Sequence, residues 1–274
     1  MYRLELQKSV TVSGVSRCKH ITHVLTDRVW ISDTEGNLIL TNTRGDILDQ
    51  VTGLSLYGGG VHTVTQNGDV IYIDSHGNII KRSKDKVKTT LIPNTSPWVS
   101  YCVYSSPFTG DLLVGILNTD TETGQVNRYN NTGEHIQTLH PNNTGQEVYR
   151  YPRYITENRN GDVIVSDLLC VVVTDSRGRY RFSYPRPPSG LRLDPRGICT
   201  DALSHILLCD DITHSVHMID KDGNYLTEID REQHGIDIPY SLSYDDITRS
   251  VWVGSYLNNT VYIYRLIYGD DNLT

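Results

Sequence analysis

The chain has 274 residues, with 25 basic and 32 acidic side chains that give a formal net charge of −7. This length allows a substantial core and one all-β domain, and the acidic balance argues against a general binder of nucleic acid or anionic membranes. No apolar run approaches the length of a membrane span, so we expect no membrane association. The segment 150–196 differs in charge, because it holds nine Arg against five acidic residues, and it is the one indication of an anionic partner.

The start of the chain and its cysteines bear on the compartment. Met1–Gly14 alternates polar and apolar residues and lacks the apolar stretch of a secretion signal. Five Cys, an odd number without a Cys-x-x-Cys pair, are typical of reduced thiols rather than of a disulfide framework. We therefore predict a cytoplasmic protein.

Six apolar runs define a repeat along the chain. They end at residues 33, 74, 116, 167, 210 and 255, so that successive copies are 41 to 51 residues apart. Each run reads as a strand, and shorter runs around it, separated by Gly, Asn and Asp turns, read as its neighbours. A period of about 40–50 residues with several short strands per copy is typical of propeller blades. The runs are Val29–Asp33, Val70–Asp74, Leu112–Ile116, Val163–Asp167, Ile206–Asp210 and Val251–Ser255.

Each copy is predicted to hold an inner strand before this run, and a third and an outer strand after it. The inner strands are expected at Ile21–Thr26, Val61–Thr65, Cys102–Ser105, Ile155–Asn158, Ile198–Asp201 and Ser241–Tyr244. The third strands are expected at Asn37–Thr41, Asn78–Arg82, Gln125–Tyr129, Cys170–Thr174, Ser215–Ile219 and Thr260–Tyr264. The outer strands of the first five copies are expected at Ile47–Val51, Val87–Ile92, His135–Leu139, Tyr180–Tyr184 and Tyr225–Ile229.

The sixth copy lacks an outer strand, because its pattern ends near Tyr268. Tyr2–Val12 reads as a strand without a copy of its own, and we expect it to complete the sixth blade, since closure removes free sheet edges. The predicted fold class is therefore all-β: a six-bladed β-propeller of four-stranded antiparallel blades, closed by the N-terminal strand within residues 2–12. Residues 1–274 are expected to form this single domain.

The clearest copies are Tyr151–Asp175 and Leu193–Gly223. They carry a Pro before the inner strand, a second strand that reads VIVSD or ILLCD, and, in the second copy, an Asp-Gly turn before the outer strand. In these features the chain resembles NHL repeats, and six blades closed by an N-terminal strand are similar to the C-terminal domain of tripartite-motif (TRIM-NHL) proteins. Those proteins are typically E3 ubiquitin ligases with RING, B-box and coiled-coil segments ahead of the propeller. This chain shows no Cys/His zinc spacing and no heptad run, so the resemblance implies a recognition module that is not itself an enzyme and needs no cofactor.

In the propeller families that the chain resembles, ligands bind around the mouth of the central channel, at positions just before each inner strand. Trp98 and Tyr101 are alternatives for the third copy. Arg in polar loops is commonly solvated, and Tyr and Trp commonly fill gaps between blades, so no single residue of this set marks a site. The candidate binding residues are Lys19, Trp98, Tyr101, Arg150, Tyr151, Arg153, Arg186, Arg192, Arg196 and Tyr240.

Four carboxylates end second strands and allow two interpretations. A ring of them would attract a cation, whereas each one alone would accept backbone N–H bonds from the turn that follows it. We favour the second interpretation, because Asp at such positions commonly caps its own turn. The four residues are Asp33, Asp74, Asp167 and Asp210.

Three functions remain open from the sequence. The leading hypothesis is docking of a protein substrate or partner on the mouth of a monomeric propeller. The second is RNA binding, because Arg interleaved with aromatic residues can contact phosphates and stack bases. The third is a metal-dependent lactonase or lyase. The predicted mouth is a poor cation site, and the pairs His20/His23 and His214/His217 would point to opposite faces of their strands.

Overall fold

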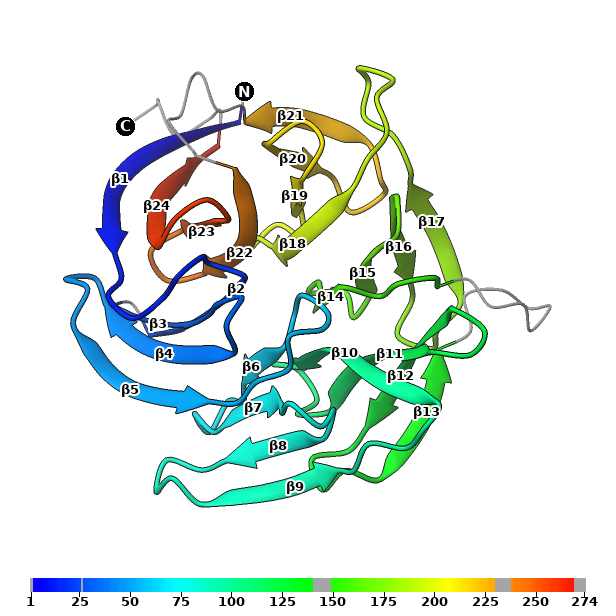
Figure 1. The fold of residues 1–274 in the computed structure, drawn as a ribbon. Coiled ribbons are helices and arrows are strands. Elements are labelled where there is room, and N and C mark those ends of the chain that lie inside the picture. Colours follow the sequence, from blue (N-terminus) through cyan, green and yellow to red (C-terminus); the bar gives the residue numbers. More distant parts are fainter. Residues whose placement is uncertain (1, 26, 140–148, 230–237, 269–274) are drawn as a thin grey trace.

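The computed structural model describes residues 2–25, 27–139, 149–229 and 238–268. Twenty-four strands form six four-stranded antiparallel sheets, which surround a central channel as blades (Figure 1). The predicted all-β, six-bladed propeller is therefore confirmed. The described residues contain no helix, and so none that is long and apolar enough to cross a membrane. All five Cys are free.

Within each blade the strands follow one another from the channel to the rim. The inner strands are β2 (His20–Leu25), β6 (His62–Val64), β10 (Trp98–Ser105), β14 (Tyr154–Glu157), β18 (Pro195–Thr200) and β22 (Pro239–Asp245). The second strands are β3 (Arg28–Ser32), β7 (Val70–Ile73), β11 (Leu112–Asn118), β15 (Val163–Asp167), β19 (Ile206–Asp210) and β23 (Ser250–Ser255). The third strands are β4 (Asn37–Asn42), β8 (Ile79–Arg82), β12 (Thr123–Tyr129), β16 (Cys170–Thr174), β20 (Ser215–Ile219) and β24 (Thr260–Ile267). The outer strands are β5 (Ile47–Thr52), β9 (Lys88–Ile92), β13 (His135–Leu139), β17 (Tyr180–Tyr184), β21 (Tyr225–Ile229) and β1 (Arg3–Thr11).

The core lies between adjacent blades rather than within any one of them. Every residue of β15 and of β19 is buried, which explains why these second strands read as continuous apolar runs instead of alternating ones. One buried cluster joins Ile164 of the fourth blade to Leu208 of the fifth. Each blade therefore depends on its neighbours for burial of its apolar faces.

The N-terminal strand closes the ring, as predicted. β1 pairs antiparallel with β24, from Arg3 opposite Ile267 to Thr11 opposite Thr260, and the sixth sheet has the order β1-β24-β23-β22. Figure 1 shows β1 at the outer edge of the blade that holds the last strand of the chain. Because the two ends of the chain share one sheet, the ring closes through hydrogen bonds.

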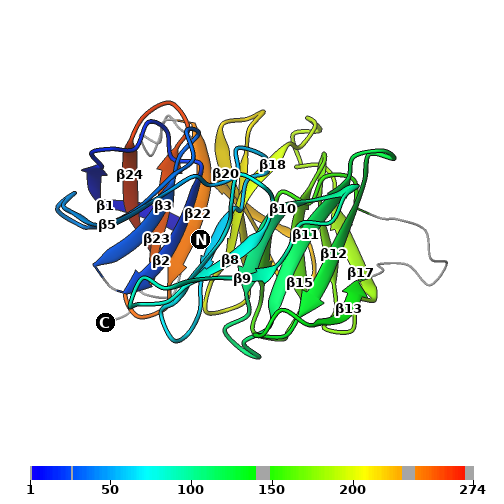
Figure 2. The same ribbon diagram turned by 60° about the horizontal axis from the view of Figure 1, so that its bottom comes forward.

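The connections gather on two faces of the disc (Figure 2). We call the face that carries the connections from each outer strand to the next inner strand the mouth face. The opposite face, which carries the turns between inner and second strands, we call the far face. The hairpins before the outer strands also lie on the far face and require a positive φ. Gly45 and Gly133 supply it with φ of 85° and 87°, and Lys86 adopts φ 66° in the second blade, which has no Gly there.

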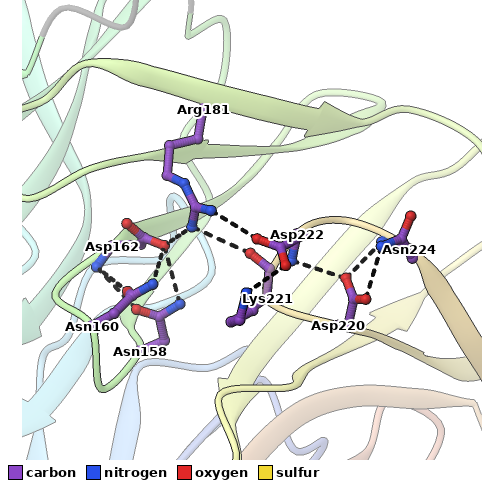
Figure 3. Close-up of polar contacts among 8 residues, drawn as sticks. All are labelled: Asn158, Asn160, Asp162, Arg181, Asp220, Lys221, Asp222 and Asn224. Carbon is purple, nitrogen blue, oxygen red and sulfur yellow. Dashed lines mark hydrogen bonds and ion pairs between the residues drawn. The ribbon is translucent and has the colours of Figure 1, made fainter.

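A charged bridge joins the fourth and fifth blades on the far face (Figure 3). The guanidinium of Arg181, on β17, bonds Asp162 in the turn before β15 and, at 2.9 Å, Asp222 in the turn before β21. Asp162 is only 4% exposed and also accepts a bond from Asn160 at 2.8 Å. Since Arg181 is fully engaged here, it contributes nothing to the mouth face.

Closure through β1 gives a first prediction. Replacement Leu4→Ala should lower the free energy of unfolding by about 2–4 kcal/mol, because it opens a cavity where β1 packs on the sixth blade. Leu4 is 4% exposed, whereas Leu6 on the same strand is 47% exposed. Replacement Leu6→Ala is the matched control and should cost less than about 1 kcal/mol. Urea denaturation measures both, and equal losses would show that β1 does not seal the ring.

The bridge of Figure 3 gives a second prediction. Replacement Arg181→Met should lower the free energy of unfolding by about 1–2 kcal/mol, because the nearly buried carboxylate of Asp162 loses its cation. Arg179, with a side chain 67% exposed, forms an ion pair with Asp175 of its own turn and with no other described residue. Replacement Arg179→Met should therefore change stability by less than about 0.5 kcal/mol. A larger loss for the Arg179 variant in thermal or urea unfolding would contradict this assignment.

Candidate functional site

A cavity of about 290 Å³ lies at the mouth of the channel, and we call it the mouth pocket. The starts of inner strands and the loops before them, from five blades, supply its walls. Its lining residues are Gly58, Gly59, Tyr101, Tyr151, Arg153, Tyr154, Arg196 and Tyr240. Two guanidinium groups and four phenol rings therefore converge on a single small cavity.

The two arginines of the mouth pocket are held by two carboxylates. Arg153 bonds one oxygen of Asp194, and Arg196 bonds the other at 2.8 Å. Arg196 also bonds Asp211 at 2.7 Å. The cluster thus contains two positive and two negative groups, so its formal charge is zero. It offers oriented N–H donors without a net attraction for polyanions.

Aromatic stacking fixes one wall of the mouth pocket. The rings of Tyr240 and Tyr256 stack with centroids 4.5 Å apart, and the guanidiniums of Arg196 and Arg17 each lie 5.4 Å from the centroid of one of these two rings. Each ring is therefore in contact with the other ring and with one guanidinium group, through a cation–π contact. These two tyrosines therefore offer no ready platform for a nucleobase.

Second-strand carboxylates shape the loops of the mouth face. Asp33 accepts backbone bonds from Glu35 and Asn37 in the following turn, each at 2.9 Å. Asp167 accepts the backbone N–H groups of Arg150 and Tyr151 instead, which ties the loop before the fourth inner strand to β15. Asp33 thus agrees with the turn-cap interpretation, whereas Asp167 binds the preceding loop, an arrangement that the sequence did not predict.

Tyr154 closes the channel beneath the mouth pocket. Its hydroxyl crosses from the fourth blade to the first and donates to the backbone carbonyl of Lys19 at 2.7 Å. Gly59 makes room for this ring, because a Cβ at Gly59 would lie 2.3 Å from it. Burial raises the pKa of Tyr154 well above its ordinary value, so the phenol stays a hydrogen-bond donor.

A glycine segment reinforces this closure from the second blade. The backbone N–H of Gly60 donates to Arg153, and its carbonyl accepts from Val103, both at 2.8 Å. The second blade therefore contacts the third and fourth through main-chain bonds at the centre of the ring. Side chains at Gly58 or Gly59 would collide with Tyr101 or Tyr154, which explains this run of glycines.

The structure brings together half of the candidate binding residues. Tyr101, Tyr151, Arg153, Arg196 and Tyr240 all line the mouth pocket. Within blade three, Tyr101 rather than Trp98 reaches the pocket. β10 starts at Trp98 and bulges between Ser100 and Cys102, a shift that the repeat spacing does not reveal.

The other candidates lie outside the pocket. Lys19 is 6% exposed, and its ammonium group donates to the carbonyl of Leu56 at 2.8 Å. Burial lowers the pKa of Lys19 to about 8. Arg150, Arg186 and Arg192 are exposed and do not line the cavity.

Sequence reasoning missed four residues that shape the pocket. Tyr154 stands one position after the expected mouth residue Arg153, so only its orientation reveals its role. Asp194 and Asp211 look like ordinary acidic turn residues in the sequence, and only the fold shows that they bond Arg196. Gly58 carried no pattern beyond its place in a glycine run.

The residues present do not fit a catalytic metal. Among the described residues no group of three or more His, Cys, Asp or Glu side chains could hold a metal ion. The two carboxylates nearest the mouth pocket, Asp194 and Asp211, are already bonded to guanidinium groups. The metal-dependent form of the lactonase or lyase hypothesis therefore receives no support from the donor set.

The sequence matches no protein-family model and no curated protein. Solved structures match its fold over nearly the whole chain. A gluconolactonase from Xanthomonas campestris has a TM-score of 0.67 at 12% identity, with 97% of this chain and 100% of that chain covered. A streptogramin B lyase has a TM-score of 0.66 at 15% identity, with 97% and 98% covered. A catalytically inactive histidine-to-alanine variant of virginiamycin B lyase from Staphylococcus aureus, with quinupristin, has a TM-score of 0.65 at 14% identity, with 97% and 100% covered.

These neighbours correct the expectation that this domain is not an enzyme. That expectation followed from the resemblance to TRIM-NHL proteins, whereas the solved propellers above are lyases and a gluconolactonase. At 12–15% identity the likeness shows the six-bladed ring that these proteins share with the chain. The ring therefore gives no ground for excluding catalysis, and the narrower TRIM-NHL identity has no support beyond the repeat pattern.

The channel closure gives a third prediction. Replacement Tyr154→Phe should lower the free energy of unfolding by about 1–2 kcal/mol, because the bond across the channel is lost. Tyr184 belongs to the same buried cluster, and its hydroxyl has no hydrogen-bond partner among the described residues. Replacement Tyr184→Phe should therefore change stability by less than about 0.5 kcal/mol. Equal effects in urea denaturation would mean that the bond to Lys19 stabilises nothing.

Proposed function

We propose that this chain is a propeller enzyme of the lactonase type, which opens a small uncharged cyclic ester in the mouth pocket without a metal ion. The observation that carries the proposal is the charge-neutral cluster of Arg153, Arg196, Asp194 and Asp211 beside four phenols. A neutral pocket rich in oriented donors suits a polar, uncharged substrate. The enzymes among the structural neighbours support this class of reaction by analogy of fold.

The chemistry follows from the donors in the pocket. Guanidinium N–H groups held by carboxylates are preorganised to stabilise the oxyanion that forms when water adds to the ester carbonyl. Burial raises the pKa values of Tyr101 and Tyr240, so both phenols remain protonated and can donate to the ring oxygen as it leaves. Water supplies both the new carboxyl oxygen and the proton on the leaving oxygen, so no other reactant is needed.

A histidine-dependent elimination receives less support. A histidine is required for activity in virginiamycin B lyase, as its inactive alanine variant indicates. No histidine lines the mouth pocket of this chain, and His20 and His62 lie below Tyr154. The hydrolytic reaction therefore agrees better with the side chains that this pocket contains.

RNA binding stays a prediction from the sequence. The pairing of Arg153 and Arg196 with carboxylates and the covered Tyr240–Tyr256 stack both weaken it. Protein docking, a monomeric state and a cytoplasmic location likewise remain predictions. A low-salt titration with pools of single-stranded RNA tests the first of them, since phosphate contacts strengthen as salt falls.

The lactonase proposal gives a fourth prediction. The protein should hydrolyse members of a lactone panel in a pH-stat assay, at rates unchanged by EDTA. Replacement Arg196→Gln should lower kcat about 10²–10³-fold, because it removes an oxyanion donor. Replacement Arg179→Gln, at an exposed far-face side chain, should leave kcat unchanged.

Three outcomes would overturn the proposal. They are the absence of turnover across the panel, inactivation by EDTA, and equal activity of the Arg196 variant and the parent. Tight, salt-dependent binding of single-stranded RNA together with no turnover would favour the RNA hypothesis instead.

A further inference from the structure

A second and larger cavity, of about 360 Å³, lies on the other side of Tyr154, and we call it the far pocket. All six inner strands line it, and turns of the far face add Phe108, Arg159 and Asp246 at its rim. The far pocket and the mouth pocket share no lining residue. His20 lines the far pocket and touches the edge of Tyr154, with ring centroids 5.4 Å apart, so Tyr154 separates the two cavities.

Buried hydrogen-bond acceptors of the far pocket lack partners. Glu157 is 5% exposed, and its Oε1 accepts a bond from Arg128 at 3.0 Å, but its Oε2 has no partner among the described residues. His62 is fully buried; one ring nitrogen bonds the Trp30 backbone, and the other has no hydrogen-bond partner in the described chain. The same holds for Nδ1 of His20. Such orphaned groups are costly unless a ligand or water satisfies them.

Both histidines are uncharged at neutral pH. Burial and the nearby charge of Lys19 lower the pKa of His20 to about 3. Burial and His20 lower the pKa of His62 well below its ordinary value, and they outweigh the hydrogen bond to the Trp30 backbone, which raises it. Their rings lie in contact, with centroids 4.4 Å apart. Each neutral imidazole carries one acceptor nitrogen, and a carboxylate is an acceptor only, so this set requires a ligand that donates hydrogen bonds.

The charged residues around the far pocket also favour a ligand that donates hydrogen bonds. Glu157, Asp201, Asp246 and Arg159 line it. Asp246 pairs with Arg159 at 3.0 Å and Asp201 bonds His205 at 2.7 Å, so Glu157 is the one of the three with an unpaired buried carboxylate oxygen among the described residues. Arg128 stands behind Glu157, outside the lining, and is shared with Asp111. The surroundings therefore favour a cation, and a channel with low-dielectric walls strengthens this preference. Three aromatic rings, those of Tyr104, Phe108 and Tyr244, also line the cavity and can face a cation.

We propose that the far pocket is a second ligand site, separate from the mouth pocket, which binds a small organic ammonium ion. The ammonium N–H groups donate to the free Glu157 Oε2 and to the unpaired imidazole nitrogens, and the aromatic rings cover the alkyl chain. A cavity of this size fits a short alkyl amine or diamine and excludes a folded polypeptide. The site is independent of lactone hydrolysis, because Tyr154 lies between the two cavities.

The test compares 1,4-diaminobutane with 1,4-butanediol, its neutral analogue, by calorimetry and by chemical-shift changes of the histidine rings. The diamine should bind at least about ten-fold more tightly than the diol. Replacement Glu157→Gln should weaken diamine binding about ten-fold, and Asp246→Asn, at the exposed rim, about two-fold. Replacement Asp120→Asn makes the same charge change in a turn outside the pocket and should leave binding unchanged. The mouth-pocket variant Arg196→Gln should also bind the diamine as the parent does.

Several results would overturn this proposal. Equal binding of diamine and diol, or no binding of diamine up to about 10 mM, would leave water as the only occupant. An unchanged affinity in the Glu157 variant would remove the assigned acceptor. Should that variant fail to fold because Arg128 loses its partner, His62→Gln decides the question, and unchanged diamine affinity in it would likewise contradict the proposal. Absence of lactone turnover would leave this result untouched, so the two proposals fail separately.

Discussion

The hydrogen bond from Tyr154 to the Lys19 carbonyl determines how the central channel of this ring is divided. A six-bladed propeller leaves a channel on its axis, and here one phenol spans it between opposite blades. The glycines of residues 58–60 let the main chain of the second blade approach the same point, where Gly60 bonds the third and fourth blades. Four blades are thus joined at the axis by hydrogen bonds, whereas elsewhere they meet mainly through apolar packing. The channel is thereby divided into two separate cavities.

The two cavities differ in charge because their ion pairs differ. On the mouth side each guanidinium has a carboxylate beside it, and Asp194 serves both Arg153 and Arg196. On the far side the carboxylates outnumber the cations, and the two histidines are uncharged. One cavity therefore suits an uncharged, polar substrate, and the other suits a cation. Within the basic segment 150–196, Arg153, Arg181 and Arg196 are held in ion pairs, whereas the anionic partner that the segment suggested stays a prediction.

The blade repeat also shows how one residue type serves several purposes. The aspartates that end second strands cap their own turns in some blades and anchor the preceding loop in others. Threonine and serine on the inner strands bond the free edge of the neighbouring blade. Ser243 accepts from the His23 backbone at 2.9 Å, and Thr200 donates to the Glu157 carbonyl at 3.0 Å. Inner-strand edges that would otherwise lack partners are satisfied in this way.

The sequence by itself determined the number of blades, the order of strands and the closing role of β1. These features follow from local patterns, namely apolar runs at a fixed spacing and turns that demand Gly, and such patterns survive the divergence of the copies. It also located five residues of the mouth pocket, because position within a blade fixes position around the channel. In the third blade the pattern left Trp98 and Tyr101 open, and the bulge in β10 accompanies the placement of Tyr101 at the mouth.

Only the tertiary structure decided what the mouth residues are bonded to. The partners of Arg196 are near it in sequence, but nothing in the pattern sets their side chains toward it, and Tyr154 reaches a carbonyl 135 residues away. The wrong expectation that this domain is not an enzyme has a related cause. Repeat motifs report the strands of a blade, and these strands are common to recognition modules and enzymes alike. Charge balance, orphaned acceptors and the division of the channel arise from contacts between blades, which no single repeat encodes.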